Sequence, residues 1–200
     1  MGDAVAWLED LAHHEHKLGA VVTSLPDAAE VDLSLGAWEL WFEAAVDRCF
    51  DASAGPSVFI QTDRKVDGQW ISKPLLIGRG CRQTLLWHRI QLRRDPGKQD
   101  LQRPTYTHIL AYGPGTPGGN HPDVLPVSKS LWTNGTPIHA AVLAVAWCRE
   151  QGAKAIVNPF SGQGTILAVA NGLGLDAYGC ELDEQRALKS EQIKLDVKRK

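Results

Sequence analysis

The stretch from residue 153 to residue 183 constrains the fold of this chain more than any other part. A short apolar run, Ala155 to Val157, reads as a buried strand because it is brief and ends at turn-forming residues. A turn with two glycines follows, and an apolar helical run occupies residues 165–170. A second strand, residues 177–180, ends on the acid Glu181. This order is typical of the nucleoside-binding half of a Rossmann-type sheet.

The turn itself, Ser161-Gly162-Gln163-Gly164, suits a bound ligand. Glycines let the backbone approach a ligand closely, and the following helix offers free N–H groups and a positive dipole end to an anion. Glu181 lies 17 residues beyond Gly164, where it can accept hydrogen bonds from two ribose hydroxyls. Leu167 stands where the dinucleotide fingerprint has its third glycine, which indicates a different nucleoside cofactor.

The segment from Asn158 to Thr165 resembles the Asp-Pro-Phe-x-Gly-x-Gly-Thr motif of amino-methyltransferases that act on DNA or RNA. The resemblance implies that S-adenosylmethionine is the cofactor. It also implies that the glycine turn holds the methionine end of the cofactor and that Glu181, the acid after the second strand, holds its ribose. The alternative is a glycine turn in some other α/β protein. The cofactor-binding residues that the resemblance implies are Asp3, Asn158, Pro159, Phe160, Ser161, Gly162, Gly164, Thr165 and Glu181.

The N-terminal region fits a circularly permuted group of that family, in which the catalytic half precedes the cofactor half. In that group an acid in a Gly-Asp motif contacts the adenine amino group. A strand then leads to a catalytic Asp/Asn/Ser-Pro-Pro-aromatic motif. Asp3 matches the acid, and Ser24-Leu25-Pro26-Asp27 occupies the place of the catalytic motif. Asp3 can equally serve as a helix cap.

The catalytic motif departs from the family in its last residue. In the family, the first side chain and the next backbone carbonyl orient the target amino group toward the sulfonium methyl. Ser24 and the Leu25 carbonyl can do this, and the resemblance makes Ser24, Pro26 and Asp27 the expected catalytic residues. Asp27 replaces the aromatic residue that stacks on a flipped base, so the stacking comes from elsewhere or the acceptor is not a base. Asp27 can instead accept a proton, hold a cationic substrate or cap a helix.

We therefore expect one α/β domain with a Rossmann-like class I methyltransferase fold, circularly permuted, whose mostly parallel sheet has an antiparallel hairpin at one edge. The length of 200 residues and the 44% hydrophobic content suit a single core. The hairpin is predicted from alternating runs at 85–92 and 105–112. The parts are a catalytic half (1–112), a short irregular insert (113–134) and a cofactor-binding half (135–200).

The other predicted elements complete this arrangement. No element is assigned to the glycine-rich, basic stretch 65–82. The remaining helices are expected at 3–19, 35–50 and 138–150 and from 183 onward, and the remaining strands at 20–25 and 57–61.

Charge is distributed unevenly along the chain, although the net charge is only −2. Residues 1–60 carry eleven acidic residues against two basic ones, whereas residues 61–103 carry ten basic against four acidic. This asymmetry indicates a surface for an anionic partner, with an ordinary solvated face as the alternative. Phosphate contacts, and hence salt-sensitive binding, are expected from Arg64, Lys65, Arg79, Arg82, Arg93, Arg94 and Lys98.

Several other features narrow the function. Sequence-specific DNA enzymes of the permuted group have a large recognition region at the place that residues 113–134 occupy in this chain. Here that segment is far shorter than a domain. Structured RNA is therefore slightly favoured over DNA. The four cysteines lack Cys-x-x-Cys spacing, so reduced thiols are expected and no metal site. No signal peptide or membrane-spanning run is found, which favours a soluble, intracellular protein.

The sequence thus predicts an S-adenosylmethionine-dependent methyltransferase whose substrate is nucleic acid. In the family an edge strand precedes the Gly-Asp motif. Here that strand is either missing, supplied by upstream residues in a longer native chain, or formed by a partner, which can be another protein or a second copy in a homodimer. Two alternatives remain open: a methyltransferase for a protein or small molecule, and a non-catalytic subunit that keeps the fold within a complex.

Overall fold

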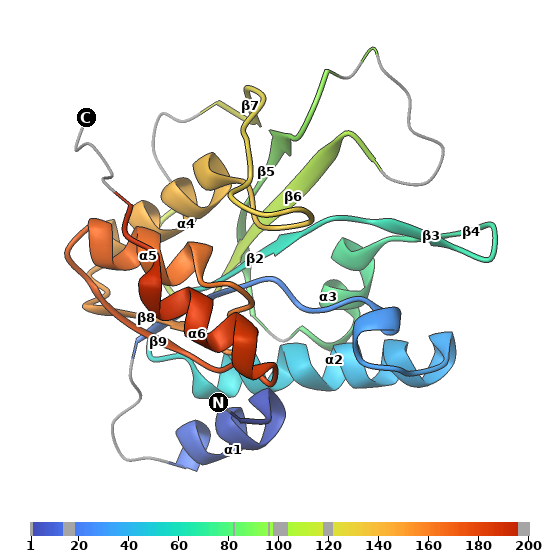
Figure 1. Ribbon diagram of the computed structural model, residues 1–200, viewed down its shortest axis with the longest axis horizontal. Helices are drawn as coiled ribbons and strands as arrows, with labels where there is room; N and C mark the ends of the chain where they lie inside the picture. Colours follow the sequence, from blue (N-terminus) through green and yellow to red (C-terminus); the bar gives the residue numbers. More distant parts are fainter. Residues whose placement is uncertain are drawn as a thin grey trace.

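A seven-stranded mixed sheet forms the centre of the computed structural model, which describes residues 2–13, 19–81, 83–95, 97, 104–117 and 122–195 (Figure 1). The spatial order is β7-β5-β6-β2-β1-β8-β9. β1, β2, β8 and β9 are parallel to one another, while β6 runs antiparallel to both β2 and β5. The strands are β1 (Ala20–Thr23), β2 (Ser57–Gln61), β5 (Leu85–Leu92), β6 (Tyr106–Tyr112), β7 (Val124–Leu125), β8 (Ala155–Asn158) and β9 (Asp176–Gly179).

Helices cover both faces of this sheet, so the fold has three layers (Figure 1). One core joins the sheet to α4 (Ile138–Glu150) and α5 (Thr165–Gly172). The opposite core joins it to α1 (Ala4–His13), α2 (Leu35–Ala52) and α3 (Lys73–Gly80). The expected α/β Rossmann-like fold, with its mostly parallel sheet, is confirmed.

The central strands are apolar on both faces because each face is covered by helices. In β2, Val58 and Ile60 enter one core while Phe59 enters the other, and all three are at most 2% exposed. At the start of β1 the chain passes close to β8. A Cβ on Gly19 would lie 2.1 Å from the carbonyl oxygen of Ala155, so only glycine permits this entry.

The structure differs from the sequence prediction chiefly between residues 64 and 80. This stretch contains a two-stranded hairpin, β3 (Arg64–Val66) and β4 (Gln69–Ile71), and the helix α3. Two glycines and a proline mask the helix in the sequence. Leu76 and Ile77 stabilise it by packing into the core, a tertiary contact that overrides the weak helix propensity.

Smaller differences concern element ends. The strand predicted at 20–25 ends at Thr23. The helix predicted at 3–19 is described as Ala4–His13, and residues 14–18 lie outside the described residues. The predicted hairpin β5–β6 is antiparallel as expected, but the short strand β7 from the irregular insert pairs with β5 and lies outside it.

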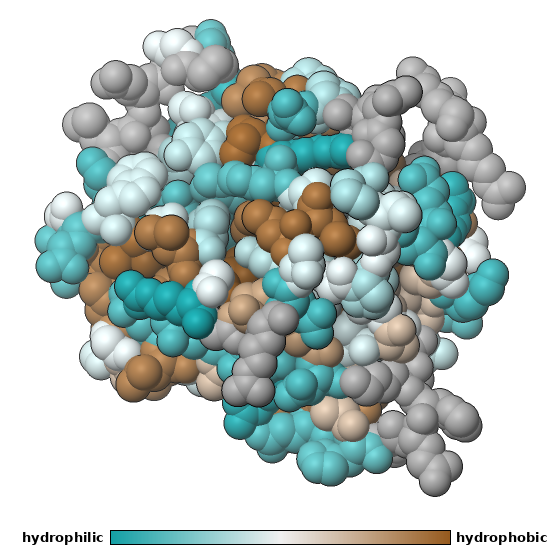
Figure 2. Space-filling model, turned by 180° about the vertical axis from the view of Figure 1, so that it is seen from behind, coloured by the Kyte–Doolittle hydropathy of each residue, from teal (hydrophilic) through white to brown (hydrophobic). Residues whose placement is uncertain are grey.

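The surface is varied in polarity. The face seen in Figure 2 is mostly hydrophilic, with its hydrophobic residues in separate patches. Across the described ranges, no helix has both the length and the apolar character needed to span a membrane.

The strand order fixes where a ligand can bind. From a point between β1 and β8, the chain builds β2 in one direction and β9 in the other. In open parallel sheets the ligand crevice lies outside the carboxyl ends of the strands at such a switch point. The segments that follow β1, β2, β8 and β9 therefore delimit the candidate site.

Candidate active site at the carboxyl edge of the sheet

The glycine turn after β8 has the left-handed backbone that its sequence predicts. Gly162 and Gly164 have φ values of 54° and 84°, which residues with a side chain rarely adopt. The turn is closed by a 2.9 Å hydrogen bond from the Gly164 N–H to the Ser161 carbonyl. A Cβ on Gly162 would meet no described atom within 4 Å, so a ligand can approach the backbone there.

Three segments that are far apart in the sequence meet beside this turn. The backbone N–H of Ser161 donates to the carbonyl of Cys180 at 2.9 Å, which ties the turn to the end of β9. The N–H of Gly2 donates to the carbonyl of Glu181 at 3.1 Å. Glu181 and Asp3 are thereby brought to the same corner of the sheet as the turn.

Both acids also have a structural role. Oδ1 of Asp3 accepts a hydrogen bond from the Ala6 N–H at 2.8 Å and so caps α1. Oε1 of Glu181 accepts from the Asp183 N–H at 3.0 Å, just before α6 (Glu184–Gln192). Each acid has a second carboxylate oxygen with which it can bind a ligand.

The other residues expected to bind the cofactor are mostly buried. Pro159, Ser161 and Thr165 are buried, and Asn158 is 1% exposed. The Asn158 side chain accepts a hydrogen bond from the Thr23 hydroxyl at 2.9 Å, which joins β8 to β1. Phe160 is half-buried and contacts Trp41 edge to face, with 5.7 Å between ring centroids. Asn158 and Thr165 therefore lie on the buried side of the turn.

Helix α6 packs against the glycine turn from outside. A Cβ on Gly164 would lie 2.5 Å from the Cβ of Ser190, and α6 lies in front of β8 and β9 in Figure 1. Arg186, four residues earlier and on the same helical face, lines the neighbouring pocket described below. The open backbone at Gly162, with Glu181 and Asp3 beside it, fits an adenosyl cofactor, and α6 bounds that space.

A pocket of about 620 Å³ opens next to this corner, beyond the ends of β1 and β2. Ser24 and Leu25 line it directly after β1, and Thr62 and Asp63 line it after β2. The Thr62 and Thr107 hydroxyls are hydrogen-bonded at 2.7 Å, which connects β2 to β6 at the pocket wall. The remaining lining residues are Asp27, Ala29, Glu30, Ile60, Arg64, Lys73, Arg93, Arg94, Pro104, Asn134, Gly135, Thr136, Pro137 and Arg186.

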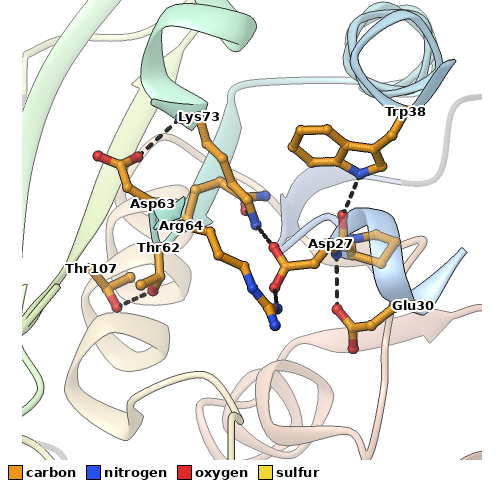
Figure 3. A network of polar contacts seen from close by, with 10 residues as sticks. Asp27, Glu30, Trp38, Thr62, Asp63, Arg64, Lys73 and Thr107 are labelled. Carbon is orange, nitrogen blue, oxygen red and sulfur yellow. Dashed lines mark hydrogen bonds and ion pairs between the residues drawn. The ribbon is translucent and has the colours of Figure 1, made fainter. Parts of the chain in front are cut away.

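Asp27 lies at this pocket between two basic side chains (Figure 3). Its carboxylate forms an ion pair with Arg64 through Oδ2 and with Lys73 through Oδ1, the latter at 2.5 Å. Partial burial alone would raise the pKa of Asp27, but these two cations outweigh it and lower the pKa below its usual value. Asp27 is therefore a charged anchor, and its lowered pKa makes it a poor proton acceptor.

The loop around Asp27 is also fixed through its backbone. The Trp38 indole donates to the Pro26 carbonyl at 3.1 Å, and the Asp27 N–H donates to Oε2 of Glu30 at 2.9 Å (Figure 3). Glu30 ends a short 3₁₀ helix, Ala28–Glu30, that begins directly after Asp27. The predicted helix-capping position of Asp27 thus coexists with its ion pairs.

Lys73 is the main residue of the site that sequence reasoning missed. Its side chain is 5% exposed, and it is the first residue of α3, the helix that the sequence did not predict. Oδ1 of Asp63 accepts from the Lys73 backbone N–H at 2.9 Å and fixes the start of that helix. Asp63 is held in turn by His108 at 3.1 Å, and His108 by His88 at 2.9 Å. The sequence signal was Ser72-Lys73-Pro74, a helix start with proline in the first turn.

The basic residues expected to contact phosphate separate into groups. Arg64, Arg93 and Arg94 line the pocket. Lys65 lies instead over the Trp70 ring on the β3–β4 hairpin, 5.6 Å from its centroid. Arg79 forms ion pairs with Glu39 and Glu43 on α2, away from the pocket. Arg82 and Lys98 lie outside the described residues.

Basic side chains exceed acidic ones around the pocket. Five cations line it against three carboxylates, and one of these carboxylates, Asp27, is shared by two of the cations. Such a pocket attracts an anionic ligand. Among the described residues, no group of three or more His, Cys, Asp or Glu side chains is arranged to hold a metal ion.

Comparison with known proteins shows similarity at the level of structure. Searches against protein-family models and curated proteins find no match. TTHA0409, a proposed DNA modification methylase from Thermus thermophilus, superposes with a TM-score of 0.69 at 22% identity, covering 96% of this chain and 91% of that one. PvuII DNA methyltransferase, which is cytosine-N4-specific, gives a TM-score of 0.74 at 13% identity, with 99% and 86% covered. The M1.HpyAVI complex with SAM gives 0.63 at 11% identity, with 96% of each chain covered. This chain therefore has the Rossmann-like fold of these solved methyltransferase structures.

Proposed function

We propose that this protein is an S-adenosylmethionine-dependent methyltransferase that modifies an exocyclic amino group of a nucleic-acid base. One observation carries this proposal. The glycine turn with its two acids and the pocket at Ser24–Asp27 lie side by side at the topological switch point of the sheet. The fold supports it, since TTHA0409 and M1.HpyAVI have both been solved in complex with the same cofactor.

The cofactor-side residues would hold the ligand in the following way. Backbone N–H groups at the glycine turn and the N-terminus of α5 face the amino-acid end, where an anionic carboxylate is favoured. Glu181 accepts hydrogen bonds from the ribose hydroxyls, and Asp3 accepts one from the adenine amino group. When bound, the cofactor supplies an electrophilic methyl group on its sulfonium.

On the acceptor side the chain would contribute positioning. Ser24 and Leu25 line the pocket directly after β1, and the Ser24 hydroxyl and the Leu25 carbonyl would accept hydrogen bonds from the target amino group. These bonds orient the nitrogen lone pair, and orientation of this kind supplies much of the rate of a transfer reaction. Asp27 does not act as a base in this scheme, because its carboxylate is already paired with Arg64 and Lys73.

The cation excess of the pocket supports a nucleic-acid substrate. We place DNA before RNA, because TTHA0409 and PvuII methyltransferase, which have the same fold, are named for DNA. The short insert at 113–134 contains only β7 among its described elements, so we expect little sequence discrimination within this chain.

We further propose that the chain has the permuted order of its family, with the catalytic half first. The segments around Gly2 and Glu181 are hydrogen-bonded to each other, and the Cys180 thiol donates to the Gly2 carbonyl at 3.1 Å. The glycine turn and Glu181 thus come from the C-terminal part, while Asp3 and Ser24 come from the N-terminal part.

Two measurements test the proposal. Calorimetric titration of the protein with S-adenosylmethionine should show one saturable site, and absence of binding by folded protein would refute the central claim. Incubation with radiolabelled cofactor and separate DNA, RNA and protein fractions should then label DNA most strongly. Label in the protein fraction alone would favour the protein-methyltransferase alternative.

The non-catalytic alternative is tested separately. If the protein binds the cofactor but labels none of the fractions, a partner would be required for transfer. In an assembled complex Ser24→Ala should then leave methylation intact, whereas our proposal expects a loss of roughly 100-fold or more, the size of a lost positioning interaction.

A further inference from the structure

The acceptor pocket lacks an obvious surface on which a base could stack. None of the described residues that line it is phenylalanine, tyrosine, tryptophan or histidine. A base that enters a protein pocket is commonly stacked on an aromatic ring, an apolar side chain or the guanidinium plane of arginine. Among the described lining residues, the arginines offer a guanidinium plane on which a base can stack.

Of Arg64, Lys73 and Arg93, which all line the pocket, Arg64 has the most suitable environment. Lys73 has no planar group and is only 5% exposed. The two terminal nitrogens of Arg93 donate to the Thr107 hydroxyl at 3.2 Å and to the Gly135 carbonyl at 3.1 Å. The Arg64 side chain is 35% exposed, which leaves part of its surface accessible at the pocket.

Asp27 anchors the Arg64 guanidinium at one edge (Figure 3). A free arginine side chain loses rotamer freedom when it is ordered, and an ion pair offsets part of this entropic cost before the ligand arrives. Lys73 binds the other carboxylate oxygen and holds Asp27 in place. Lys73 is itself fixed by Asp63 at the start of α3.

From these contacts we infer that Arg64 is the stacking surface for the acceptor base, and that Asp27 and Lys73 are positioning residues that hold its guanidinium plane. The inference rests on the proposed function and deepens it. The family motif has an aromatic residue at the position of Asp27. Here Asp27 does not stack on the base; it holds the guanidinium of Arg64, which provides the flat surface.

The same arrangement selects the class of acceptor. Arg64 and Lys73 together carry two positive charges against one negative charge on Asp27, so the cluster remains cationic. A neutral, electron-rich ring is attracted to such a surface through its π face. A lysine or arginine side chain of a protein substrate would be repelled. Arg64 therefore selects a neutral nucleobase over a cationic amine.

Substitutions at Arg64 separate planarity from charge. The probe is a short single-stranded DNA oligonucleotide, with its equilibrium Kd and its KM for methyl transfer as readouts. Arg64→Ala should raise both the Kd and the KM by about 5- to 150-fold, the effect of losing roughly 1–3 kcal/mol of stacking. Arg64→Lys keeps the charge and should lose as much, whereas Arg64→Trp keeps a plane and should stay within about threefold of wild type.

The matched control is Arg48→Ala. Arg48 is also 35% exposed and also pairs with one carboxylate, Glu9, but it lies on α2 away from the pocket. Its substitution should leave both constants unchanged. The calorimetric affinity for S-adenosylmethionine should stay at the wild-type value in every Arg64 variant, which shows that these variants are folded.

The opposite pattern would overturn the inference. If Arg64→Lys binds like wild type while Arg64→Trp loses affinity, Arg64 contributes charge. In that case the slope of log affinity against log salt should also fall by about 0.7 in Arg64→Trp, as for a lost phosphate contact. If the wild type methylates DNA and Arg64→Ala has the same Kd and KM, only the role of Arg64 is refuted and the proposed function stands. Absence of any nucleic-acid binding by the wild type refutes the proposed function as well.

Discussion

The two halves of the candidate site are built in different ways. On the proposed cofactor side one continuous stretch, 158–181, supplies the glycine turn and the acid Glu181 that we propose for the ribose, and its geometry is set by backbone conformation and strand pairing. On the acceptor side the groups come from separate elements and are held by side-chain charges. Site residues that lie close together in the sequence can be recognised as a motif. Site residues that are held together by ion pairs between distant segments can be recognised only in the folded structure.

The largest effect should come from breaking the charge cluster on the acceptor side. Asp27→Ala removes the carboxylate beside the nearly buried Lys73 ammonium and should cost about 3 kcal/mol of unfolding free energy. Urea denaturation at neutral pH measures this loss. The double variant Asp27→Ala/Lys73→Met should recover most of the stability, because no buried charge is left unpaired. A double variant no more stable than Asp27→Ala would contradict the cluster.

The cofactor side should respond to backbone changes instead. Gly164→Ala places a methyl group 2.5 Å from the Ser190 Cβ at a φ of 84°, and should cost about 2–3 kcal/mol. The matched control is Gly162→Ala, which has left-handed backbone but open space, and should cost about 1 kcal/mol. Thermal unfolding compares the two, and equal losses would show that α6 does not pack on the turn.

Removing a single ligand contact should have a smaller effect and should leave folding intact. Glu181→Gln weakens the hydrogen bonds offered to the ribose and should raise the cofactor Kd about tenfold, or roughly 1.4 kcal/mol. Glu184→Gln, on an exposed residue in the first turn of α6, is the control and should change the Kd less than about twofold. Calorimetry on both variants decides whether Glu181 or general negative charge matters.

The acceptor side should also be the more sensitive to acid. Because the pKa of Asp27 is lowered in the folded protein, its ion pairs stabilise the fold above the unfolded pKa of about 4, and this contribution is lost as pH falls through the folded value. Wild type should therefore lose stability more steeply than Asp27→Asn below about pH 4. Parallel acid curves for the two proteins would show that the ion pairs add nothing.

The smallest effect is expected at Arg79, which the charge pattern had suggested as a phosphate contact. Its side chain is 59% exposed and pairs with Glu39 and Glu43 outside the pocket. Arg79→Ala should change stability by less than about 0.5 kcal/mol and oligonucleotide affinity by less than twofold. A reduced salt dependence of binding in this variant would extend the nucleic-acid surface over α3.

Sequence reasoning succeeded where residues that act together are close in the chain. The glycine turn, its helix α5 and the acid after β9 follow one another along a single short stretch, so spacing alone predicted the βαβ unit. The hairpin β5–β6 was also predicted correctly, because its two alternating runs are consecutive in the chain and a charged loop joins them. Local patterns are sufficient when backbone geometry decides the structure.

The sequence alone determined that this chain forms a mostly parallel α/β sheet with a glycine turn at a strand end. It also showed that Asp27 departs from a known motif. It could not show that Asp27 would be paired with Arg64 and Lys73, which lie 37 and 46 residues further along the chain. Only the tertiary structure decided this. An ion pair depends on the distance between two charged groups in the folded chain, and the periodicity and spacing of the sequence do not give that distance.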